Sequence, residues 1–199
     1  ALVRCHPNNP DGRHFDLDSL EATRQKLAAS GGWLIIDEAY ADLVPTQSLA
    51  SKGGADGLII LRSFGKFFGL AGVRLGAILA PAPIRKAMSK RLGVWPVSGV
   101  ALEIGARAYA DTDWQLRTRK RLHVAATELD VALKAAGLSL TGGTDLFRLV
   151  ETEDAHAVFH SLATTGVYAR RFEGSSTHLR IGLPATSAAQ ARLLNALTL

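Results

Sequence analysis

Cysteine is almost missing from this sequence: Cys5 is the only one among 199 residues, so no internal disulfide can form. A lone cysteine is more often a small core residue than a nucleophile. No apolar run approaches the roughly 20 residues of a membrane-spanning helix. The first residues also lack the basic and then apolar build of a signal peptide. We therefore expect a cytoplasmic protein with no membrane partner.

Clustered metal ligands and a phosphate-binding P-loop are missing as well. The histidines are scattered, and the single pair at i, i+4 spacing, His156 and His160, is typical of an exposed helix face. The stretch GKFFG (65–69) lacks the P-loop spacing, and Phe67 stands where that motif has its metal-binding hydroxyl. We expect no metal site.

Positive charge is present in excess, but it is dispersed. The net charge is +5, and the densest basic group, RTRKR (117–121), lies within a helical pattern. Such a run is usually a solvated helix face, and no aromatic residues alternate with it as a stacking platform for bases would need. We expect no nucleic-acid partner. Several basic residues could instead meet an anionic cofactor and substrate.

The first half of the chain alternates short apolar runs with helical segments. Continuous apolar strands indicate a sheet covered on both faces, which is typical of the α/β class. The segment between the first two runs is long enough for a helical crossover between parallel strands. The pattern predicts strands at 1–5, 33–37, 57–63 and 74–80, and helices at 16–30 and 82–92.

The second half has a different pattern, with one long helical stretch followed by short alternating strands. The helical stretch covers 99–136, with a break near 111–113; strands are predicted at 138–143, 146–151, 166–172 and 178–184, and helices at 154–165 and 187–198. This is an α+β pattern, so we expect one domain at 1–97 and a second at 98–199. A sheet with so few strands suggests the C-terminal part of a larger protein.

Polar side chains stand in four places at or just beyond the ends of the predicted strands of the first half. Each has an ordinary explanation alone: a turn for Asn9, a helix cap for Asp37, a surface position for Lys66. All lie where open α/β sheets bind ligands, beyond the carboxyl ends of strands. The segments are NNPDG (8–12), DEAY (37–40) and SFGK (63–66), followed across a glycine-rich loop by Arg74.

Together these residues meet the needs of one cofactor. Desolvation by Phe64, Phe67 and Phe68 would favour the neutral amine of Lys66, which condenses with an aldehyde. Asp37 suits a pyridinium nitrogen. A ring oxygen needs donors, which Asn9 and Tyr40 could supply, and a phosphate needs a forked donor and a hydroxyl, which Arg74 and Ser63 could supply. These are the needs of pyridoxal 5′-phosphate.

The ordered motifs NPDG, DEAY, SFGK and an arginine eight residues after the lysine resemble those of the class I/II aminotransferase family of fold-type I pyridoxal-phosphate enzymes. The resemblance implies that Lys66 bonds to the cofactor aldehyde and moves protons. It implies the ring and phosphate roles above for Asp37, Asn9, Tyr40, Ser63 and Arg74. It also implies the C-terminal part of the large-domain sheet plus a small α+β domain, and a homodimer. In this family a preceding segment supplies a ring-stacking aromatic residue, a phosphate-binding loop and a tyrosine lent across the dimer.

The resemblance extends to substrate-binding residues. HLRIGLP (178–184) resembles the segment whose arginine binds the substrate α-carboxylate, which assigns that role to Arg180; Asn9 also faces the substrate. Arg170 in GVYARRF (166–172) is a candidate for a substrate phosphate, and its neighbour Arg171 remains an alternative. The ordinary explanation for each is a solvent-facing arginine.

Within the family, RSFGKFFGLAGVRLG (62–76), PVSGVALEIG (96–105) and GGTDLFRLV (142–150) most resemble threonine-phosphate decarboxylase-like proteins of cobalamin biosynthesis, which are close to histidinol-phosphate aminotransferases. Our first hypothesis is decarboxylation of threonine phosphate to an aminopropanol phosphate. The second is an aminotransferase acting on a phosphorylated amino acid. A third is an inactive relative that serves as an interaction module, against which the intact Lys66, Asp37 and Arg74 count.

Overall fold

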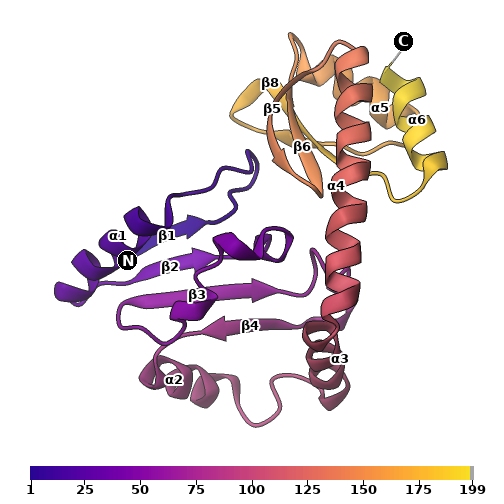
Figure 1. Cartoon of the computed structure of the whole chain (residues 1–199). Coiled ribbons are helices and arrows are strands. Elements are labelled where there is room, and N and C mark those ends of the chain that lie inside the picture. Colours follow the sequence, from indigo (N-terminus) through magenta and orange to yellow (C-terminus); the bar gives the residue numbers. More distant parts are fainter. Residues whose placement is uncertain (198–199) are drawn as a thin grey trace. The chain divides into compact units, whose positions relative to one another are not determined.

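The computed structural model describes residues 1–197, and these form two compact units with separate sheets (Figure 1). The first unit contains Ala1–Asn9 and Arg13–Trp114. The second contains Pro10–Gly12 and the chain from Gln115 onward. Each unit has its own hydrophobic core. The division into domains at 1–97 and 98–199 stays a prediction.

The sheet of the first unit follows the predicted strands closely. Its strands are β1 (Leu2–Cys5), β2 (Leu34–Asp37), β3 (Leu58–Ser63) and β4 (Gly76–Leu79), in that order. The first three are parallel, with α1 (Leu17–Ala29) as the crossover between β1 and β2, whereas β4 runs antiparallel to β3. The carboxyl ends of β1, β2 and β3 therefore meet at one edge. Because Gly76 pairs with Ser63, the start of β4 lies at the same edge.

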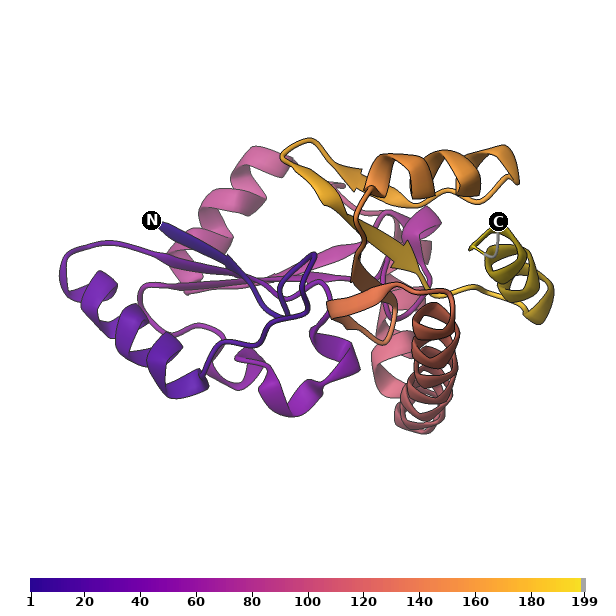
Figure 2. The ribbon, with the colours of Figure 1, turned by 90° about the horizontal axis from the view of Figure 1, so that it is seen from above.

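One face of this sheet is packed. Leu34, Ile36, Leu58 and Ile60 are fully buried there beneath apolar side chains of α1 and of the 3-10 turns between β2 and β3. Both covering segments lie on the same side of the sheet (Figure 2). On the alternate face, Val3 is 60% exposed and Leu61 is 40% exposed. In the described residues the alternate face is therefore partly exposed, because side chains alternate between faces and α1 covers only one of them.

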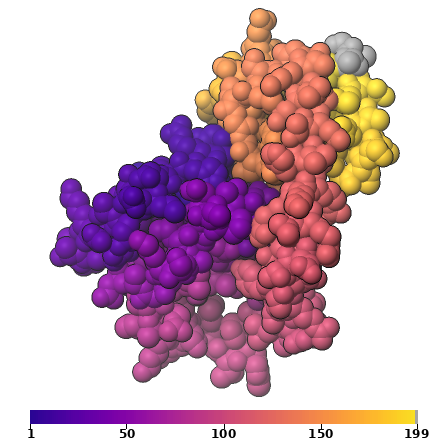
Figure 3. Space-filling view, viewed as in Figure 1, coloured from indigo at the N-terminus to yellow at the C-terminus, as the bar shows by residue number. Residues whose placement is uncertain are grey.

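Three helices follow: α2 (Ala82–Leu92), α3 (Gly99–Ala110) and α4 (Thr112–Ala135). The predicted break between the last two is confirmed, because Asp111 ends α3 and its carboxylate accepts a hydrogen bond of 2.9 Å from the Trp114 N–H at the start of α4. One side of α4 faces solvent (Figure 3). Arg117, Lys120 and Arg121 of this helix are exposed. No helix among residues 1–197 is long and apolar enough to cross a membrane.

The second unit is an antiparallel sheet with helices against it. The strands are β5 (Ser139–Thr144), β6 (Phe147–Glu151), β7 (Arg170–Phe172) and β8 (Ser175–Gly182), in the order β5-β6-β8-β7. Helices α5 (Ala155–Thr164) and α6 (Ser187–Leu197) join α4 around a core that includes Leu133, Leu162 and Leu179. Residue 198 of the predicted helix 187–198 lies outside the described residues.

The turn that follows Asn9 packs tightly within the second unit. The Asp11 carbonyl accepts a hydrogen bond of 2.9 Å from the Gly143 N–H. Gly12 has a φ of +70°, and a Cβ atom there would lie 1.7 Å from the Gly143 carbonyl oxygen. Both the backbone conformation and the close approach therefore require glycine at position 12.

We predict that Gly12→Ala destabilises the complete protein far more than Gly31→Ala. Gly31 has nearly the same φ, +68°, but nothing within 4 Å of its Cβ position. The Gly31 variant should therefore show only the left-handed strain, roughly 1–2 kcal/mol, while the Gly12 variant adds a backbone clash. Urea unfolding measures both, and equal losses would contradict the packing described here.

Candidate functional site

Six of the predicted site residues belong to the first unit. They lie at or beyond the edge of its sheet where the carboxyl ends of β1, β2 and β3 meet. Asp37 and Ser63 are the last residues of β2 and β3, and Asn9 follows β1 in the next turn. Tyr40 and Lys66 stand three residues beyond Asp37 and Ser63, and Arg74 lies two residues before β4. The parallel register explains this gathering, because parallel strands place their carboxyl ends together.

Asp37 and Ser63 are half-buried and share one face of the sheet. Asp37 pairs with Leu61, and Ser63 lies two residues further along the same strand. Each side chain is held by a local backbone N–H: the Asp37 Oδ1 accepts from Ala39 at 3.0 Å, and the Ser63 Oγ accepts from Gly65 at 3.2 Å. These contacts orient a carboxylate and a hydroxyl at the ends of neighbouring strands.

Lys66 and Tyr40 approach each other, with the Lys66 Nζ 5.8 Å from the centre of the Tyr40 ring. Tyr40 is buried, being 6% exposed. Lys66, however, is exposed, so the expectation that phenylalanines desolvate it is wrong for the described chain.

The phenylalanines around Lys66 pack elsewhere. Phe64, Phe67 and Phe68 are buried and contact one another, with Tyr109 of α3 and Trp114 of α4 completing the cluster. The Phe68 and Trp114 rings are stacked, with centres 6.0 Å apart. The aromatic cluster therefore anchors the turn after β3 and leaves Lys66 at the surface.

Arg74 has an unusual backbone. It ends the 3-10 turn η4 (Ala71–Val73) with a φ of 56°, the one non-glycine residue with positive φ in the described chain. Its Nη1 donates to the Ala71 carbonyl at 3.0 Å, and the side chain is exposed. A left-handed conformation costs an arginine on the order of 1–2 kcal/mol, and such strain is concentrated at functional sites.

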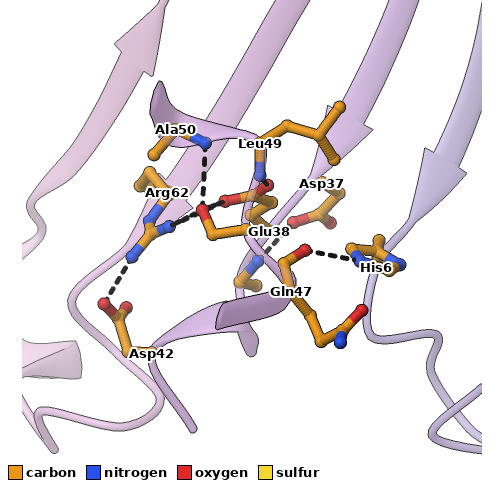
Figure 4. Close-up of polar contacts among 10 residues, drawn as sticks. His6, Asp37, Glu38, Asp42, Gln47, Leu49, Ala50 and Arg62 are labelled. Carbon is orange, nitrogen blue, oxygen red and sulfur yellow. Dashed lines mark hydrogen bonds and ion pairs between the residues drawn. The ribbon is translucent and has the colours of Figure 1, made fainter. Parts of the chain in front are cut away.

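A buried ion network lies beside these residues, and the sequence argument missed it. Glu38 is 0% exposed, and its Oε2 binds the Arg62 Nη1 at 2.7 Å. The Arg62 Nη2 binds Asp42 in the turn η1 (Ala41–Leu43) (Figure 4). Burial alone would lower the pKa of Arg62, but the carboxylates of Asp42 and Glu38 outweigh it and raise that pKa above its ordinary value. The sequence does contain a signal for this network. A charged residue stands next to each predicted site residue at a strand end, Glu38 beside Asp37 and Arg62 beside Ser63.

His6, directly after β1, connects the end of a third strand to the segment between β2 and β3 through hydrogen bonds. The ring is 0% exposed. Its Nδ1 accepts from the Phe15 N–H at 3.1 Å, which leaves the hydrogen on Nε2 to donate to the Gln47 carbonyl at 2.8 Å (Figure 4). Gln47 ends the turn η2 (Pro45–Gln47). The segment after β2 is thus joined to the ends of β1 and β3.

Arg170 and Arg180 come together in the second unit. They are directly paired across β7 and β8, so both side chains stand on the same face of that sheet. Arg180 is half-buried, with its guanidinium carbon 5.1 Å from the centre of the Phe147 ring. Its neighbours Leu179 and Ile181 enter the core on the other face.

Arg171 is turned to the opposite face from Arg170. It pairs with the buried Leu179, and its guanidinium carbon lies 4.3 Å from the centre of the Phe159 ring of α5. An open cavity of about 830 Å³ is lined by residues that include Arg170, Arg171, His156, His178 and Glu173. Both arginines line this cavity, but only Arg170 shares a sheet face with Arg180, because Arg170 pairs with Arg180 and Arg171 pairs with Leu179.

The residues of the first unit fit pyridoxal 5′-phosphate by their chemistry. An amine, a carboxylate, a phenol, a hydroxyl and a guanidinium gather at one edge, matching an aldehyde, a pyridinium nitrogen, a ring oxygen and a phosphate. In the described residues, no group of three or more histidine, cysteine, aspartate or glutamate side chains is placed to hold a metal ion.

Known proteins of one family match this chain along its length. The family model "Aminotransferase class I and II" matches residues 1–197. A threonine-phosphate decarboxylase from Pseudomonas aeruginosa is 42% identical over 97% of this chain and 58% of its own. Histidinol-phosphate aminotransferase 1 from Legionella pneumophila is 33% identical over 91% of this chain and 51% of its own. The chain thus spans less than two thirds of these relatives.

A solved structure shares the fold. The histidinol-phosphate aminotransferase from Sinorhizobium meliloti, in complex with pyridoxal 5′-phosphate, superposes with a TM-score of 0.86 at 22% identity. The match covers 98% of this chain and 55% of that one. The predicted α/β fold of pyridoxal-phosphate transferases is therefore confirmed.

Proposed function

The chain belongs to the class I and II aminotransferase family, and from this premise we propose that the complete protein binds pyridoxal 5′-phosphate at the carboxyl edge of the first sheet. The observation that carries the proposal is the gathering of six side chains from separate segments at that edge. These are Asn9, Asp37, Tyr40, Ser63, Lys66 and Arg74.

The bound cofactor supplies an electron sink for a bond broken at the substrate Cα. Lys66 would hold the cofactor through its side-chain amine and would carry a proton to or from the substrate. The Asp37 carboxylate would hold a proton on the ring nitrogen, Asn9 and Tyr40 would donate to the ring oxygen, and Ser63 and Arg74 would bind the phosphate. The centre of the Tyr40 ring lies 5.8 Å from the Lys66 Nζ, which supports the proposal that both residues belong to one cofactor site.

We further propose that the second unit binds the anionic groups of the substrate. Arg180 takes the α-carboxylate and Arg170 takes a phosphate, while Asn9 keeps its predicted substrate contact. Like charges directly opposite each other on a sheet repel, and Arg170 and Arg180 are so placed. An anion between or beside them relieves that repulsion.

The reaction we favour is decarboxylation of threonine phosphate to an aminopropanol phosphate, a step in cobalamin biosynthesis. Its support is the 42% identity with a threonine-phosphate decarboxylase. The second candidate is transamination of a phosphorylated amino acid, supported by the 33% identity with a histidinol-phosphate aminotransferase. Both use a substrate with a phosphate, which suits the paired arginines.

We also propose that the protein is a homodimer. Val94 and Trp95, between α2 and α3, are 84% and 90% exposed, and Val100 and Leu102 are exposed at the start of α3. Apolar surface of this kind is typical of protein interfaces, and a second copy of the chain would cover it.

Borohydride reduction tests the cofactor assignment. We predict that the complete protein, incubated with pyridoxal 5′-phosphate and reduced, carries a phosphopyridoxyl group on Lys66, because reduction fixes the carbon–nitrogen bond between lysine and cofactor. Peptide mass spectrometry locates it. Lys66→Ala should abolish the adduct, whereas Lys52→Ala should leave it intact. A protein without an adduct on Lys66 would be an inactive relative.

Product analysis separates the two reactions. With threonine phosphate, we expect release of CO2 in proportion to the substrate consumed, without keto acid. Accumulation of a keto acid in the presence of an amino-group acceptor, without CO2, would establish the aminotransferase alternative. If neither product formed, threonine phosphate would be excluded as the substrate.

The two neighbouring arginines provide a matched pair. Arg170→Gln should lower kcat/KM for threonine phosphate by roughly 10–100-fold, the effect of losing a hydrogen bond between charged groups. Arg171→Gln should change it less than threefold, since Arg171 packs on Phe159 at the other face. Steady-state kinetics measure both. A larger loss in the Arg171 variant would reverse the assignment.

A further inference from the structure

The ends of β2 and β3 each carry a candidate site residue with a charged neighbour, of which Glu38 is fully buried and Arg62 is half-buried. Asp37 is followed by Glu38, and Ser63 is preceded by Arg62. Side chains alternate between the two faces of a sheet. Since Asp37 and Ser63 share one face, Glu38 and Arg62 meet on the other, where their side chains are 2.7 Å apart. The ion pair therefore joins the two strand ends from the reverse side of the site.

We define the strand-end ion network as Glu38, Asp42, Ser48 and Arg62. The Glu38 Oε2 accepts from the Ser48 hydroxyl at 2.6 Å and from the Arg62 Nη1 at 2.7 Å, and the Arg62 Nη1 is 3.0 Å from the Ser48 Oγ. The Glu38 Oε1 accepts from the Leu49 N–H at 2.6 Å. Arg62 also binds Asp42 through Nη2 (Figure 4). Both oxygens of a fully buried carboxylate are thus satisfied.

Buried ion networks of this kind add little to the stability of a fold. Taking charges out of water costs several kcal/mol per ion, and well-packed apolar residues are often as stable as a buried ion pair. What directional ion pairs add is a defined relative position of the groups they join. The two strands here contribute opposite ends of one binding site, namely Asp37 for the ring nitrogen and Ser63 for the phosphate.

We propose that Glu38 and Arg62 are positioning residues, which fix the separation of Asp37 and Ser63 for pyridoxal 5′-phosphate; this rests on the proposed function. The backbone supports the same alignment, because the Glu38 N–H donates to the Leu61 carbonyl at 2.9 Å, one residue before Arg62. A slip of β2 against β3 would move a ring ligand relative to a phosphate ligand. The ion network resists that slip without touching the cofactor.

Cofactor binding by variants of the complete protein tests this role. Arg62→Gln should raise the dissociation constant for pyridoxal 5′-phosphate roughly tenfold or more, the size of effect seen for residues that orient ligands. The absorption band of the bound cofactor should also titrate at a shifted pH, because the Asp37 carboxylate is displaced from the ring nitrogen. Arg62→Lys, which keeps the charge, should recover part of both.

Arg24→Gln is the matched control. Arg24 binds Glu21 at 2.6 Å within α1 and donates to the Asp56 carbonyl at 2.5 Å, two residues before β3, so it lies in the same unit but away from the carboxyl ends of the strands. Its loss should leave the dissociation constant and the titration of the band unchanged. Should Arg62→Gln fail to fold, Glu38→Gln replaces it, because the amide oxygen of glutamine can still accept a hydrogen bond.

Unchanged cofactor affinity and titration in the folded Arg62 or Glu38 variant would overturn the positioning role alone. Failure of the unsubstituted protein to bind the cofactor would overturn the proposed function and the positioning role with it. The two failures are distinguished by the unsubstituted protein, which is measured first.

Discussion

The parallel alignment of β1, β2 and β3, held at their carboxyl ends by buried polar contacts, is the constraint on which the first unit's site depends. Glu38 and Arg62 join β2 to β3, and His6 joins the end of β1 to Gln47. Each strand end carries or leads to one candidate site residue. Because parallel strands end at a common edge, Asp37 and Ser63 share one face there, while the Glu38–Arg62 contact lies on the reverse face.

The turn after β3 shows how packing decides the environment of a reactive side chain. Phe64, Phe67 and Phe68 are buried against Tyr109 and Trp114, and that contact anchors the turn. Lys66 is left exposed within an apolar stretch. Anchoring of the turn and shielding of the lysine are separate functions, and the three phenylalanines serve the first. The strained backbone of Arg74 is held by the same loop.

The second unit divides its sheet between two tasks by the alternation of side chains. Leu179 and Ile181 face the helices and form the core, while Arg180, between them in sequence, stands on the opposite face beside Arg170. Adjacent arginines in the chain are separated by the same rule, since Arg171 packs on Phe159 of α5. A step of one residue along β7 thus decides whether an arginine stands on the candidate substrate face or on the face covered by the helices.

The sequence by itself determined the elements and the candidate residues, because these depend on local patterns. Apolar runs placed the strands, Asp111 marked the break between α3 and α4, and the motifs around Asn9, Asp37 and Lys66 named the family. Tertiary structure alone decided which side chains meet. The placement of Arg170 and Arg171 on opposite faces, the exposure of Lys66 and the pairing of Glu38 with Arg62 depend on contacts between segments distant in the chain. A linear pattern shows which residues follow a strand, but not what lies across the sheet from them.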